Sequence, residues 1–198
     1  MFRPYMVFVF LLVTLFPQLP VPSAFAAPSA IGQVQETVDE VLVVLGDKTL
    51  EESVRREKLR TLIRNRFDFA LMSQWTLGVY WRQADAAQQK RFIDLYGELL
   101  EKSYLGKIEA YTDEKVNYLG EKIEGQRAQV ETEIATTSAN IPLVYRLTLD
   151  GDKWMVFDVV IEGVSLVRNY RSTFGEIARK EGIDGLLNQL AKKVEEQK

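Results

Sequence analysis

The chain of 198 residues contains neither cysteine nor histidine. The lack of cysteine excludes disulfide frameworks, thiol nucleophiles and thiolate zinc sites, and the lack of histidine excludes every imidazole acid, base or metal ligand. A serine–histidine–aspartate triad is therefore impossible. Without disulfides, the chain must be stabilised by its own apolar core, and its length allows one such domain.

Positive charge and phosphate-binding motifs are also scarce. The formal net charge is -3, with 25 Lys and Arg against 28 Asp and Glu, so the chain lacks the basic surface typical of a nucleic-acid-binding protein. It contains no glycine-rich phosphate loop and no internal repeat. We therefore expect no nucleic-acid partner, no metal site and no cofactor.

The amino terminus has the pattern of a secretory signal. Arg3 precedes an apolar run at residues 6–16, which is followed by prolines and by the small-residue site Ala24-Phe25-Ala26. We place cleavage after Ala26, so that residues 1–26 are a signal peptide and residues 27–198 form a single domain. The apolar run is too short to span a bilayer. The pattern predicts an exported protein, with an uncleaved amino-terminal anchor as the alternative.

Apolar residues recur at three- and four-residue steps through four segments of the first half of the chain. The predicted helices span about 31–45, 50–66, 67–78 and 86–111, and Asp85 with Gln88 forms a capping-box pattern before the last of them. The second helix is rich in basic residues that are expected to face outward, either as a solvated face or toward an acidic partner or membrane. These residues are Arg55, Arg56, Lys58, Arg60, Arg64 and Arg66.

From Lys115 the apolar period changes to two, which is typical of half-buried strands. Turn residues at Glu124-Gly125 and Asp150-Gly151 separate the alternating segments. Together with the apolar run 154–161, the pattern predicts a four-strand antiparallel meander covered by helices on one face, which is an α+β fold. Two helices, at about 166–179 and 184–193, follow and are separated by Gly182.

The stretch from Trp154 to Gly185 combines a strand that is apolar on both faces with an amphipathic helix. An apolar stripe runs along this helix, with Arg171 at its edge and Arg168 and Arg179 outside it. One interpretation is ordinary core packing. The other is a surface that faces an apolar, anionic ligand.

Several segments together resemble the MlaC family of periplasmic phospholipid-binding proteins, also called toluene-tolerance auxiliary components of an ABC transporter. The segments are FDFALMSQWTLGVYW at 67–81, QQKRFIDLYGELLEKSY at 88–104, YRL at 145–147, and WMVFDVVIEGVSLVRNYR at 154–171 followed by GIDGL at 182–186. Their order and spacing are more specific than any one segment alone.

The resemblance implies a fold similar to nuclear transport factor 2, in which helices wrap a curved antiparallel sheet into a cone around an apolar cavity. It also implies a periplasmic carrier of phospholipid that supports outer-membrane lipid asymmetry and is not an enzyme. Its expected partners are phospholipid, an outer-membrane lipoprotein complex, and an inner-membrane complex of an MCE-domain ring and an ABC transporter, each contacted transiently. The acyl chains are expected in the cavity and the headgroup near its mouth.

A lipid carrier must enclose its cargo. A two-tailed lipid has roughly 30 methylene and methyl groups, and at about 0.8 kcal/mol each their removal from water is worth more than about 20 kcal/mol. A groove open to water cannot supply this environment. We therefore assign a surplus of large apolar residues to the walls of a cavity.

The predicted lipid contacts lie on two helices, on the sheet and on the final apolar stripe. On the strand 154–161 we favour Phe157, Val159 and Ile161, because Asp158 then lies on the other face. Arg171 is the candidate for the headgroup phosphate, which a guanidinium can hold with two hydrogen bonds, and a surface salt bridge is its alternative role. The predicted lipid-contacting residues are Phe67, Met72, Trp75, Leu77, Tyr80, Phe92, Leu95, Tyr96, Leu99, Leu100, Tyr145, Leu147, Phe157, Val159, Ile161, Val164, Val167 and Tyr170.

Two other functions remain open at this point. An isomerase or dehydratase on the same cone fold would use Asp158 with Tyr145 or Tyr170 as its acid–base set. A non-lipid adaptor of the cell envelope would dock through residues 55–66 and the last helix, and it predicts a filled core without a cavity.

Overall fold

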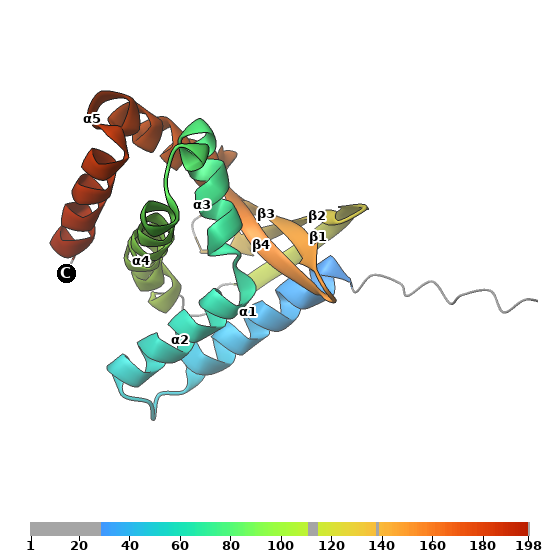
Figure 1. Cartoon of the computed structure of the whole chain (residues 1–198). Helices are drawn as coiled ribbons and strands as arrows, with labels where there is room; N and C mark the ends of the chain where they lie inside the picture. Colours follow the sequence, from blue (N-terminus) through green and yellow to red (C-terminus); the bar gives the residue numbers. More distant parts are fainter. Residues whose placement is uncertain (1–28, 111–114, 138, 198) are drawn as a thin grey trace, which may run out of the picture.

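The computed structural model describes residues 29–110, 115–137 and 139–197, so the predicted signal peptide lies outside the described residues. Helices come first along the chain, a sheet follows, and a long helix ends it (Figure 1). The helices are α1 (Ala30–Gly46), α2 (Glu52–Arg66), α3 (Phe69–Leu77), the 3₁₀ helix η1 (Gly78–Arg82), α4 (Ala86–Glu109) and α5 (Leu166–Glu196). The strands are β1 (Lys115–Glu124), β2 (Arg127–Ala135), β3 (Asn140–Asp150), β4 (Lys153–Ile161) and β5 (Val164–Ser165).

The sheet is an antiparallel meander in the order β1-β2-β3-β4-β5. Gly125 and Gly151 occupy the two predicted hairpin turns with φ of 59° and 61°, a conformation that glycine adopts without steric cost. The α+β class and the antiparallel meander are therefore confirmed. The prediction of four strands is one short, because the two-residue strand β5 pairs with β4 beyond the turn at Gly163.

Local signals set the ends of the helices. The predicted capping box at the start of α4 is present in both directions, since the Asp85 carboxylate accepts from the Gln88 backbone N–H at 2.8 Å and the Gln88 side chain accepts from the Asp85 N–H at 3.0 Å. The last helix is interrupted at Gly182, which has non-helical φ and ψ of 72° and -177°. This break corresponds to the predicted separation of two final helices.

The helices form two groups around the sheet (Figure 1). The hairpin of α1 and α2 lies at one end of the molecule, and α1 contacts β1 and β2. The other group contains α3, α4 and α5, which pack on one another through an aromatic cluster. Within this cluster Phe174 contacts Phe92 and Tyr96 edge to face at centroid distances of 5.7 and 5.9 Å.

A β-bulge changes the faces of strand β4. Arg146 pairs with Asp158, but the next residue, Leu147, pairs with Val156, so Phe157 is an extra residue in β4. Trp154 and Val156 before the bulge then share a face with Val159 and Ile161 after it. The prediction that Phe157 shares the face of Val159 is wrong, because it assumed an uninterrupted alternation. Phe157 instead packs against Trp75 of α3, with ring centroids 5.6 Å apart.

A cavity between the sheet and the helices as the candidate functional site

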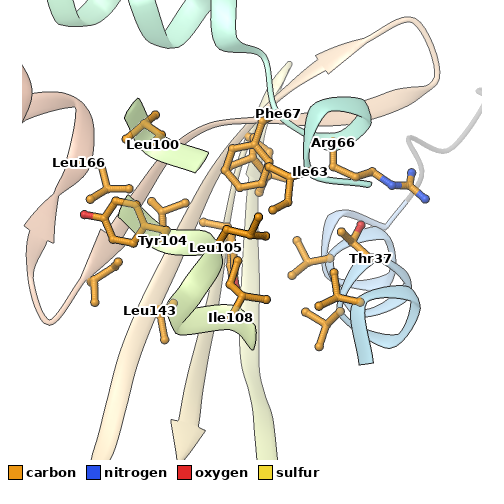
Figure 2. A pocket seen from close by; sticks show the side chains of 18 of the residues that line it. Thr37, Ile63, Arg66, Phe67, Leu100, Tyr104, Leu105, Ile108, Leu143 and Leu166 are labelled. Carbon is orange, nitrogen blue, oxygen red and sulfur yellow. The ribbon is translucent and has the colours of Figure 1, made fainter. Parts of the chain in front are cut away.

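An apolar cavity of about 260 Å³ lies between the sheet, the α1–α2 hairpin and the carboxyl-terminal half of α4 (Figure 2). The sheet contributes Val116, Ile134, Leu143, Tyr145, Leu147, Trp154, Val156, Val159 and Ile161. The helices and their junctions contribute Gln33, Val34, Thr37, Val38, Val41, Leu42, Ile63, Arg66, Phe67, Phe69, Met72, Leu100, Glu101, Tyr104, Leu105, Ile108 and Leu166.

The polar groups of the α1 wall are used within the protein. The Gln33 side chain donates to the carbonyl of Trp154 and accepts from its backbone N–H at 3.0 Å, which ties α1 to β4. The Thr37 hydroxyl donates to the Gln33 carbonyl at 2.8 Å. Burial raises the pKa of the Tyr145 phenol on the opposite wall, so this group is neutral at ordinary pH. The cavity therefore presents mainly hydrocarbon to its contents.

Glu101 is the charged residue buried in the wall. Its two carboxylate oxygens accept from Nε of Arg60 at 2.9 Å and from Nε of Arg64 at 2.6 Å, and its side chain is 4% exposed. The hydrogen bond to Glu101 raises the pKa of Arg64. The basic residues of α2 were expected to face outward, and Arg60 and Arg64 are 37% and 56% exposed. They also join α2 to α4, as does Arg56, whose Nε lies 3.0 Å from a carboxylate oxygen of Glu109.

Arg66, at the carboxyl end of α2, is less exposed than the other paired arginines of this helix, at 19%. It lines the cavity, and Nη2 lies 3.3 Å from a carboxylate oxygen of Glu36 and 3.5 Å from one of Glu40. Figure 2 shows its guanidinium on the side of α1, near Thr37 and away from Leu100 and Leu166. Sequence reasoning missed Arg66 as a site residue, since six basic residues share this helix and only the fold singles one out.

Seven of the eighteen predicted lipid-contacting residues line the cavity: Phe67, Met72, Leu100, Tyr145, Leu147, Val159 and Ile161. The other eleven lie outside this lining. Six are buried where α3, α4, α5 and β4 pack together: Leu77, Phe92, Tyr96, Leu99, Phe157 and Val167. Tyr80, Leu95 and Tyr170 pack against the same cluster, whereas Trp75 and Val164 are 45% and 55% exposed. The predicted set therefore mixes cavity wall with ordinary helix packing.

The wall formed by α1 was not predicted as part of a site. Its lining residues Val34, Val38, Val41 and Leu42 form the apolar stripe of the first helix. A stripe of this kind indicates that a helix face is covered. The stripe does not distinguish a face that packs in the protein core from one that contacts a ligand, so the sequence could not identify α1 as a cavity wall.

Arg171 does not line the cavity. It is exposed, and its guanidinium lies over Gly78 at the end of α3, where a Cβ atom on Gly78 would come within 2.8 Å of Nη2. Gly78 has a φ of 58°, and its N–H donates to the Gln74 carbonyl. A cation near the last carbonyls of a helix is favourable. The structure thus places Arg171 as a contact of the α3 carboxyl terminus.

Gly78→Ala is expected to lower the free energy of unfolding by about 1–3 kcal/mol, because an alanine is strained at the positive φ of this position, and its methyl group also displaces the exposed Arg171 guanidinium. Urea unfolding of the two proteins measures the difference. Gly106→Ala is the matched control, since nothing lies within 4 Å of a Cβ there and the position is helical. Equal destabilisation by both substitutions would contradict the role assigned to Gly78.

The structure separates Asp158 from Tyr145, one of the two tyrosines of the enzyme alternative. Asp158 accepts from the Ser165 hydroxyl at 2.7 Å and the Val167 N–H at 3.1 Å, and it pairs with Arg146 at 3.0 Å. Its hydrogen-bonding capacity is therefore used in holding β4, β5 and the start of α5 together. Tyr145 faces the cavity, whereas Asp158 lies opposite Arg146 and outside the lining.

The adaptor alternative predicted close packing between the sheet and the long helix. The cavity lies in that space, lined by Tyr104 and Leu105 of α4 and by Leu143 and Val159 of the sheet. No helix in the described ranges is both long and apolar enough to cross a membrane. Within the same ranges, no cluster of three or more acidic side chains is arranged to hold a metal ion.

Comparison with known proteins agrees with this architecture. The family model described as MlaC protein matches residues 35–192. A solved structure, that of a phospholipid-binding protein from Ralstonia solanacearum in complex with a phospholipid, superposes with a TM-score of 0.77 at 25% sequence identity. The superposition covers 85% of this chain and 98% of that protein.

Two curated relatives were also found. The intermembrane phospholipid transport system binding protein MlaC of Haemophilus influenzae is 29% identical over 142 residues, which are 67% of this chain and 66% of the relative. The toluene tolerance protein ttg2D of Pseudomonas putida is 25% identical over 121 residues, which are 57% of this chain and 56% of the relative. The chain thus spans just under two thirds of the first relative and just over half of the second.

Proposed function

Because the chain belongs to the MlaC family, we propose that it is a soluble periplasmic carrier that binds phospholipid in the cavity between its sheet and α1. The carrier exchanges lipid with an outer-membrane lipoprotein complex and with an inner-membrane complex of an MCE-domain ring and an ABC transporter, as part of Mla-type intermembrane lipid transport. The single observation that supports this most is the cavity itself, whose walls come from apolar side chains of the sheet and of helices α1 to α5.

The chemistry of the walls suits acyl chains. Transfer from water to an apolar enclosure is worth about 0.8 kcal/mol per methylene group, and a bilayer offers the same gain. A chain held among Trp154, Leu143 and Leu105 is therefore close in free energy to one in a membrane. Lipid then passes between membrane complex and carrier with little net cost, and the energy for directional transport comes from outside this protein.

The cavity must widen to hold a whole lipid. Its volume of about 260 Å³ falls below the range of about 300–1,000 Å³ that is usual for drug-sized ligands, and a two-tailed phospholipid is larger than these. The α1 wall is the part that moves in this proposal. It is held to β4 through Gln33, to β1 through the Ile31 N–H, which donates to Glu121 at 2.7 Å, and to α2 through the ion pairs of Arg66 and apolar packing around Leu45 and Leu59. These contacts loosen as the cavity widens. In the widened state, the sheet and helices form a cone similar to nuclear transport factor 2.

Native mass spectrometry of gently purified protein tests this function. We expect a mass increment of one phospholipid per chain, and extraction followed by lipid mass analysis should identify its class. As a positive control, protein stripped of lipid should regain the increment after incubation with phospholipid vesicles. A protein that is consistently empty and takes up no lipid from vesicles would refute the proposal.

A further inference from the structure

Arg66, a residue of the cavity lining, forms ion pairs with two partly exposed carboxylates of α1, those of Glu36 and Glu40. Arg66 lines the cavity with a side chain that is 19% exposed, while the side chains of Glu40 and Glu36 are 40% and 62% exposed. Exposure therefore rises from the arginine to the two carboxylates. We call these three residues the rim cluster.

The rim cluster carries one positive and two negative charges. Glu36 and Glu40 are four residues apart on α1, so their side chains lie on the same face of that helix, where like charges repel. Arg66 contacts both at 3.3 and 3.5 Å, distances longer than those of a tight charge-assisted hydrogen bond. One guanidinium thus serves two carboxylates, and one negative charge of the cluster is left without a partner of its own.

The other charged residue of the lining is already fully engaged. Glu101 is paired with Arg60 and Arg64 and is almost inaccessible. Among the described lining residues, Arg66 is the one that carries a positive charge. A lipid phosphate that stays near the cavity therefore finds its cationic contact at the rim cluster.

We propose that the rim cluster selects phospholipids with a zwitterionic headgroup, an ammonium-bearing phosphate ester, over anionic ones; this inference rests on the proposed lipid-carrier function. Arg66 holds the phosphate through two N–H groups, and Glu36 and Glu40 accept hydrogen bonds from the ammonium group. The arginine leaves its carboxylates for the phosphate, and the ammonium group replaces it as their partner. The rim then carries two positive and three negative charges, so its net charge is the same as before the lipid binds.

An anionic headgroup leaves this arrangement incomplete. A phosphate with an uncharged glycerol substituent engages Arg66 but brings no cation, so both carboxylates lose their partner and repel the added negative charge. These side chains are partly exposed, and each such interaction is therefore modest. The interactions of Glu36 and Glu40 together are still large enough to produce a preference for the zwitterionic lipid that a competition between two lipids can measure.

The experiment is a competition between two lipids with identical acyl chains. Full-chain protein stripped of lipid is incubated with vesicles of equal phosphatidylethanolamine and phosphatidylglycerol content, re-isolated, and its bound lipid is quantified by mass spectrometry. We expect the wild type to be enriched in phosphatidylethanolamine. Glu36→Gln with Glu40→Gln should lower the bound ratio of phosphatidylethanolamine to phosphatidylglycerol by about 3- to 10-fold, as two partly exposed charge interactions imply.

Two variants complete the design. Glu195→Gln with Glu196→Gln removes the same total charge at the exposed end of α5 and should leave the lipid ratio unchanged. Arg66→Gln should lower uptake of both lipids, because both carry the phosphate. An unchanged ratio in Glu36→Gln with Glu40→Gln, at normal total uptake, would overturn the selectivity alone. Absence of lipid from the wild type would instead overturn the carrier function.

Discussion

Leu143→Trp is expected to lower the phospholipid bound per chain about tenfold or more, a change that corresponds to at least about 1.4 kcal/mol of binding free energy. Leu143 lies on β3, faces the cavity and pairs across the sheet with Ile161. A larger indole at this position occupies the volume that the proposal assigns to acyl chains. Overpacking a filled core costs about 1–3 kcal/mol of stability, but here the added atoms enter existing space, so the fold should survive.

Lipid uptake from vesicles, measured by native mass spectrometry, tests this expectation, and circular dichroism confirms that the variant is folded. Val54→Trp is the matched control, because Val54 lies on α2, is 45% exposed and is outside the cavity lining. The control should bind lipid like the wild type. Normal binding by a folded Leu143→Trp protein would mean that the acyl chains occupy a different part of the molecule.

Arg60→Met combined with Arg64→Met is expected to lower the free energy of unfolding by about 3–5 kcal/mol, because it leaves a buried carboxylate without a partner. Glu101 is 4% exposed and depends on these two guanidinium groups. The free-energy cost of burying the Glu101 carboxylate is then no longer offset by its attraction to the two guanidinium groups. Chemical denaturation at neutral pH, with the midpoint and slope both recorded, gives the magnitude.

Adding Glu101→Gln to the same protein should recover most of the lost stability, since the unpaired charge is removed. Lys90→Met serves as the comparison. Lys90 pairs with Asp94, but their side chains are 77% and 62% exposed, so its loss should cost less than about 1 kcal/mol. A double variant as stable as Lys90→Met would show that Glu101 does not join α2 to α4 in the way described.

Local interactions made several features of this protein readable from its sequence. The capping box of Asp85 and Gln88, the turns at Gly125 and Gly151 and the break at Gly182 each involve residues close together in the chain. The change from helical to alternating apolar period placed the helices before the sheet. The family resemblance rests on such segments, and the match of the MlaC family model confirms it.

The candidate site depended on contacts between distant residues. The bulge that turns Phe157 away from Val159 is defined by the register of β3 with β4. It could not be predicted from the sequence of β4 alone. The ion pairs of Arg60 and Arg64 with Glu101 were not predicted, because Glu101, about 40 positions later, is brought to them only when α2 packs on α4.

The sequence by itself therefore determined the class of fold, the order of the elements and the family, because periodicity, caps and turns are local properties of the chain. Only the tertiary structure decided which apolar stripes enclose a cavity and which charges stand at its rim. The α1 stripe around Val38 and the stripe of α4 around Phe92 look alike in the sequence, yet one lines the cavity and the other packs against α5. The reason is physical. An apolar stripe in the sequence predicts only that this face of the helix is buried, and what buries it depends on how all the elements pack together.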